Sequence, residues 1–94
     1  MERYNDTIEL EVEFQKGNHI LFATVSGLVY IEIDEECNPN DEQVYNIKME
    51  SFTLQENEVD CDSCTTELLS PVIFEENIEE VKQLLIDKCY SINS

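Results

Sequence analysis

The chain has very few basic side chains. Among its 94 residues only five are lysine or arginine, against 22 aspartates and glutamates, which gives a formal net charge of −17. A protein that binds nucleic acid or an anionic membrane directly needs a basic patch to neutralise phosphates. The composition supplies no such patch, so the sequence argues against both of these partners.

The motifs that usually carry catalysis are also missing. His19 is the single histidine, so the H-E-x-x-H zinc motif, which needs two histidines, is excluded. There is no phosphate-binding loop and no G-x-S-x-G nucleophile motif. We interpret His19, which follows a predicted turn, as a surface residue, and we expect a protein that is not an enzyme.

Long apolar segments are absent as well. No apolar run reaches the roughly 18 residues that a transmembrane helix needs, and the first residues, MERYNDTIEL, lack the apolar region of a signal peptide. The length suits one domain, residues 1–94. We therefore expect a single cytoplasmic domain whose four cysteines are reduced.

What the sequence does contain is a clear alternation near its start. Residues 7–15 place an apolar side chain at every second position, which predicts a half-buried strand. The positions between them carry Glu9, Glu11 and Glu13. The following KGN, residues 16–18, predicts a hairpin turn with Gly17 at a positive φ.

The second predicted strand spans residues 19–33 and is apolar on both faces. A strand of this kind is usually central and covered on both sides, and Ser26–Gly27 indicates a bulge. After a loop over residues 34–43, a third strand is predicted for residues 44–54, with Tyr45 pointing inward. The odd-numbered positions of the second strand are expected to face the core. Its even-numbered face also carries four apolar side chains: Ile20, Phe22, Leu28 and Tyr30.

The C-terminal segment predicts an amphipathic helix that begins between Pro71 and Asn77. Ser70 could cap it, with proline at the first helical position, or Asn77 and Glu80 could form a capping box. Residues 55–70 are expected to be irregular, with one short turn at residues 65–69. One helical stripe is apolar: Phe74, Ile78, Val81, Leu85, Cys89 and Ile92. The expected fold is α+β, a small antiparallel sheet of three to four strands packed against one C-terminal helix.

Three segments together, TIELEVEF, IKMESFTL and EENIEEVKQLL, resemble small acidic accessory proteins of tailed bacteriophages. The resemblance implies a virus-encoded protein that works in the cytoplasm of the host cell. Accessory proteins this acidic often resemble DNA mimics of the anti-restriction and anti-CRISPR type.

The charge itself favours the same hypothesis. A compact chain of this length has a radius of gyration of about 12 Å and is roughly 32 Å across, and a duplex of that length carries roughly 19 phosphates. The 22 carboxylates match that number. We therefore predict a stoichiometric inhibitor that fills the basic nucleic-acid groove of a host protein. The contact residues would be Glu9, Glu11, Glu13, Glu35, Glu36, Glu75, Glu76, Glu79 and Glu80.

Two alternatives remain open at this stage, besides an acidic surface that is merely solvated. The apolar even-numbered face of the second strand could bury against a second copy, as a homodimer, or against a virion component. The cysteines could instead staple the domain around zinc, although only one C-x-x-C pair is present. The four ligands would be Cys37, Cys61, Cys64 and Cys89. We expect no cofactor and no metal in the leading hypothesis.

Overall fold

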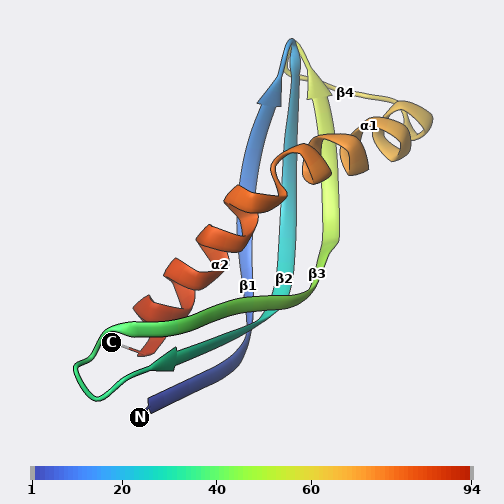
Figure 1. The fold of residues 1–94 in the computed structure, drawn as a ribbon. Helices are drawn as coiled ribbons and strands as arrows, with labels where there is room; N and C mark the ends of the chain where they lie inside the picture. The colour runs from blue at the N-terminus through green and yellow to red at the C-terminus, as the bar shows by residue number, and fades with distance from the viewer. Residues whose placement is uncertain (1, 94) are drawn as a thin grey trace.

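The computed structural model describes residues 2–93, and it shows a four-stranded antiparallel sheet followed by two helices (Figure 1). The predicted α+β class is confirmed, but the expectation of one C-terminal helix is wrong because there are two. The sheet order follows the chain order. The strands are β1 (Glu2–Lys16), β2 (His19–Ile33), β3 (Pro39–Glu56) and β4 (Val59–Asp60), and the helices are α1 (Ser63–Glu76) and α2 (Ile78–Asn93).

The β1–β2 hairpin follows the sequence pattern closely. Its register is unbroken from Glu2 opposite Ile33 to Lys16 opposite His19. Gly17 has the predicted positive φ, 61°. The apolar positions of β1 face the core and the alternate glutamates are exposed. The alternation therefore fixed both the strand and its orientation correctly.

Strand β3 is longer and less regular than predicted. It begins at Pro39, inside the expected loop, and its pairing with β2 shifts twice near the middle of the sheet. Asn46 has a φ of 55°, a conformation that asparagine tolerates better than most residues. Each bulge adds a residue and bends the strand, which accounts for the bend of the sheet in Figure 1. Because of these shifts Tyr45 lies opposite Leu28 and is 46% exposed, so its predicted inward orientation is wrong.

The two helices cover one face of the sheet, which we call the inner face. Helix α1 lies against β3, and α2 crosses β1, β2 and β3 (Figure 1). Gly27 allows the close approach of α2, because a Cβ atom there would lie 3.0 Å from Cδ1 of Leu85 and 3.1 Å from Cγ1 of Val44. The buried core between the layers consists of Ile8, Val12, Phe14, Leu21, Ala23, Val25, Val29, Ile31, Leu54, Ile73, Val81, Leu85, Ile86 and Cys89.

The opposite face of the sheet, which we call the outer face, carries no helix. Strand β2 is central, as predicted, but only its inner side is covered. Phe22 on the outer side is 39% exposed, and Leu28 and Tyr30 are half-buried among their neighbours in the sheet. The expectation that both faces of β2 are covered is therefore wrong.

The first half of helix α1, residues 63–70, lies in a segment that was expected to be irregular apart from one short turn. It begins after Asp62, whose side chain accepts a hydrogen bond from the backbone N–H of Thr65 at 2.7 Å. Ser70 and Pro71 are inside the helix, so neither starts it. Asn77 separates α1 from α2, and its side-chain amide donates to the carbonyl of Ile73 rather than forming the predicted capping box.

The apolar stripe predicted for the C-terminal helix is confirmed in its centre. Val81, Leu85 and Cys89 are fully buried, whereas Phe74 and Ile78 are half-buried and Ile92 is exposed. The apolar stripe of the helix therefore extends beyond the part of the sheet against which the helix packs.

The overall shape differs from the compact body that the length suggested. The Cα radius of gyration is 15.5 Å, and the Cα atoms span 51 × 19 × 19 Å. The 15 residues of β1 and of β2 extend for roughly 50 Å at about 3.3 Å per residue. The length of the hairpin therefore sets the length of the molecule.

The contact between Leu85 and Gly27 gives a stability prediction. Leu85→Ala should destabilise the protein by about 2 to 5 kcal/mol, because it leaves a cavity under β2. Gly27→Ala should cost about 1 to 3 kcal/mol by overpacking the same contact. The double variant should lose less than the sum, since the new methyl group enters the space that Leu85 vacates. Urea denaturation of the four proteins measures this cycle, and strict additivity would show that the two sites do not touch.

The cap of α1 gives a pH prediction. The hydrogen bond from the Thr65 N–H lowers the pKa of Asp62, so the cap stabilises the fold above the unfolded-state pKa and this contribution disappears as pH falls through the lowered folded-state value. Asp62→Ala should lower the melting temperature at pH 7, whereas Asp62→Asn should keep most of it. The advantage of aspartate over asparagine should vanish in strong acid. A melting temperature of Asp62→Ala equal to that of the wild type at pH 7 would contradict the capping role.

Candidate functional site

The row of glutamates on β1 lies on the outer face, along one edge of the sheet. Glu9, Glu11 and Glu13 are exposed, and their apolar neighbours in β1 point to the helices. In the pairing with β2, Glu13 is opposite Phe22 and Glu11 is opposite Thr24. The row therefore borders an open surface in the middle of which an aromatic ring is exposed.

The basic side chains of the protein do not neutralise this row. Among residues 2–93, Arg3 pairs with Glu32, Lys16 with Glu76, Lys48 with Glu50 and Lys82 with Glu79. On the far side of the outer face, Glu50 also accepts a hydrogen bond from the Ser26 hydroxyl at 2.8 Å, and this bond lowers its pKa. Within the described chain, the carboxylates of the row have no such partner.

The other predicted contact residues lie elsewhere. Glu75 and Glu76 end α1, and Glu79 and Glu80 begin α2, so all four belong to the layer on the inner face. Glu76 reaches Lys16 at the end of β1, while Glu79 lines a hollow between α2 and β3 together with Lys82 and Gln83.

Glu35 and Glu36 are in the turn between β2 and β3, at the opposite end of the molecule from the β1–β2 turn (Figure 1). The nine predicted carboxylates are exposed, but the structure divides them among the outer face, the helical layer and this turn. They do not form one patch.

The elongated shape also changes the comparison with DNA. A duplex of 51 Å carries roughly 30 phosphates at one per about 1.7 Å, which exceeds the 22 carboxylates of the chain. The match in total charge that a compact body suggested is therefore wrong. Any resemblance to a phosphate backbone must come from a local arrangement.

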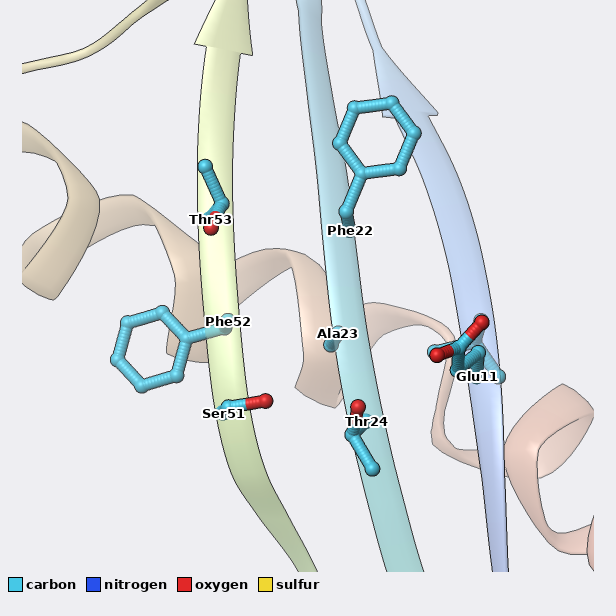
Figure 2. A pocket seen from close by; sticks show the side chains of 8 residues that line it. Glu11, Phe22, Ala23, Thr24, Ser51, Phe52 and Thr53 are labelled. Carbon is cyan, nitrogen blue, oxygen red and sulfur yellow. The ribbon is translucent and has the colours of Figure 1, made fainter.

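A shallow hollow of about 310 Å³ lies beside the glutamate row, in the half of the outer face nearer the β1–β2 turn (Figure 2). Thr24 and Ser51, which lie opposite each other on this face, are small, so they leave space next to the ring of Phe22. Figure 2 shows Glu11 at the β1 side of the hollow and the helices passing behind the sheet. The lining residues are Glu11, Val12, Phe22, Ala23, Thr24, Ser51, Phe52 and Thr53.

The four cysteines do not assemble into a zinc site. Cys37 is exposed in the β2–β3 turn, Cys64 is exposed in the first turn of α1, and Cys89 is buried in the core. Cys61 follows β4 and is half-buried. Burial, followed by the negative charges of Glu56, Asp62 and Asp60, raises the pKa of the Cys61 thiol.

A different group of possible ligands forms at the end of the sheet near the β1–β2 turn. His19 Nε2 lies 3.5 Å from Glu56 Oε2, and Cys61 completes a group whose ligand atoms all lie within 4.8 Å of one another. The interpretation of His19 as an isolated surface residue missed this group. The alternation of β2, which places His19 on the same side as Leu21, was the available signal, but the pairing with Glu56 and the return of the chain at β4 were not predictable from it.

Comparison with known proteins finds no matching family model, no matching curated protein and no matching solved structure. Within residues 2–93, neither helix has the length and apolar character that crossing a membrane requires.

Proposed function

We propose that this chain is a non-enzymatic inhibitor, encoded by a bacteriophage, that occupies the basic nucleic-acid groove of a host protein through its outer sheet face. The observation that carries the proposal is the exposed row of Glu9, Glu11 and Glu13, which has no ion pair within the described chain. The net charge of −17 supplies the long-range attraction, because a strong field of one sign steers an oppositely charged partner.

The spacing of the row does not reproduce the phosphate spacing of one DNA strand. Alternate residues of an antiparallel strand are about 6.8 Å apart, whereas phosphates of one DNA strand rise about 3.4 Å each along the axis. The proposed likeness to DNA is therefore a line of negative charge and not a phosphate-by-phosphate match. Lysines and arginines of the groove would then meet carboxylates where they normally meet DNA.

The hollow beside Phe22 supplies a central anchor. An arginine of the partner could lay its planar guanidinium on the exposed ring, where a cation–π contact is favourable, and donate to Glu11 or Glu13 on the neighbouring strand β1. Each exposed ion pair contributes only about 0.2 to 1 kcal/mol. The row and the ring should therefore bind together, with neither a single glutamate nor the ring sufficient alone.

Charge reversal of the row tests this surface. The triple variant Glu9→Lys, Glu11→Lys and Glu13→Lys should weaken binding at least about 100-fold, because like charges replace attractive contacts. The control variant Glu67→Lys, Glu75→Lys and Glu80→Lys makes the same change in net charge on exposed helical positions and should bind with a much smaller loss. The measurement is capture of nucleic-acid-binding proteins from a bacterial lysate on each immobilised protein, followed by surface plasmon resonance with the captured protein.

Duplex DNA provides the second arm of this experiment. Saturating DNA should displace the captured protein from the wild-type chain, and higher salt should slow the association. Capture that persists with saturating DNA, or that tolerates reversal of the β1 row, would reject the proposal.

The apolar side chains of the outer face favour one second candidate, an assembly module. Phe22, Leu28, Tyr30 and Tyr45 share this face, which no element of residues 2–93 covers. A second copy could bury them, although two chains of this charge repel each other.

Native mass spectrometry separates the two candidates. The inhibitor proposal predicts a monomer at low micromolar concentration. A dimer that Phe22→Asp converts to monomer, while Leu84→Asp on the exposed side of α2 does not, would favour assembly instead.

A further inference from the structure

Three different metal-binding side chains converge at the end of the sheet near the β1–β2 turn. His19 is the first residue of β2, Glu56 is the last residue of β3, and Cys61 follows β4. Their ligand atoms, an imidazole nitrogen, a carboxylate oxygen and a sulfur, lie within 4.8 Å of one another. They come from separate segments and meet only because the chain folds back twice at this end.

The distances suit a tetrahedral ion. Zinc binds histidine nitrogen and carboxylate oxygen at about 2.0 to 2.2 Å and cysteine sulfur at about 2.3 Å, so tetrahedral ligands lie about 3.3 to 3.6 Å apart. His19 Nε2 and Glu56 Oε2 are already 3.5 Å apart. The Cys61 sulfur lies within 4.8 Å of both atoms, so zinc would draw it closer by up to about 1.2 Å.

The backbone holds the three positions together. His19 pairs with Glu56 across β2 and β3, and the N–H of Cys61 donates to the carbonyl of Leu54 at 2.9 Å. Asn57 and Glu58, both with positive φ, make the tight turn that returns the chain to this place. The side-chain amide of Gln55 donates to Asp60 at 3.0 Å and braces the same turn.

We propose that His19, Glu56 and Cys61 bind one zinc ion. A thiolate and an imidazole favour zinc over the hard cations calcium and magnesium, which prefer oxygen ligands. Three protein ligands leave a fourth coordination position, and a hollow lined by Glu56, Asn57, Val59, Asp60 and Cys61 opens beside them for water or a partner's side chain. The carboxylates of Asp60 and Asp62 add negative charge near the thiol that favours a cation.

Such an ion would join β2, β3 and the segment that leads into α1. Cys61 lies directly before the Asp62 cap, so zinc would hold the start of α1 against the sheet. The zinc site is separate from the outer face. Zinc binding can therefore be tested independently of the proposed inhibition.

The test is titration of the purified chain with zinc, in millimolar magnesium to mask the surface carboxylates, followed by native mass spectrometry. We expect one zinc per chain and a rise in melting temperature. Cys61→Ser and His19→Gln should each weaken binding at least about tenfold. The matched control is Cys64→Ser, which removes the other thiol of the C-x-x-C pair and should bind zinc as the wild type does.

Cobalt gives a readout that folding alone does not change. The cobalt-loaded wild type and Cys64→Ser should show a thiolate-to-cobalt charge-transfer band that Cys61→Ser lacks, while circular dichroism confirms that each variant is folded. Absence of a one-to-one zinc complex, equal affinity in folded Cys61→Ser, or an equal loss in Cys64→Ser would overturn the assignment.

Discussion

The packing of α2 on the inner face of a long two-stranded hairpin is the interaction on which the rest of the structure depends. Leu85 reaches the backbone of β2 at Gly27, and Val81 and Cys89 are buried on either side along the helix. Because strand side chains alternate in direction, this contact fixes which side of every β1 and β2 residue is buried. Once the apolar set faces the helices, the glutamates of β1 must face solvent on the other side. A slip of one residue would bury a row of carboxylates.

The same architecture makes a net charge of −17 tolerable. In a compact body most carboxylates would lie within a short distance of one another, whereas here the Cα atoms extend over 51 Å. The Debye length at physiological salt is about 8 Å, so charges at the two ends of the molecule scarcely interact. Four of the five basic side chains also form ion pairs with acids, and none of these pairs involves Glu9, Glu11 or Glu13 of the β1 row. Repulsion is therefore reduced over most of the surface, while the row keeps its charge.

The sequence predicts the local parts of this fold better than its global shape. Alternation in β1 and the helical stripe through Val81 and Leu85 are strong periodic signals, and both were interpreted correctly. The first half of helix α1 was missed because acids flank Cys61 directly before it, although Asp62, Leu69 and Ile73 have the spacing of a cap and a buried stripe. The bulges that turn Tyr45 outward depend on how β3 pairs with β2, which no local pattern encodes.

The candidate sites show the same division. Exposure of the nine glutamates was predictable, since each lies opposite an apolar stripe or in a turn. Their separation into three regions was not, because it depends on which face the helices cover. The group of His19, Glu56 and Cys61 depends on a two-residue strand, β4, that returns the chain to the end of the sheet. Proximity of this kind arises from long-range pairing and is invisible in the spacing of residues along the chain.

We propose that the outer face binds a basic partner while the inner face serves only the fold. Side-chain NMR during titration with an arginine-rich peptide at low salt tests it most directly. The claim predicts that the Phe22 ring and the methyl groups of Thr24 and Thr53 shift first, that added salt reverses the shifts, and that the methyl groups of Leu68, Val72 and Leu84 on the exposed side of the helices stay in place. Shifts that begin on the helices and leave Phe22 unchanged would contradict it.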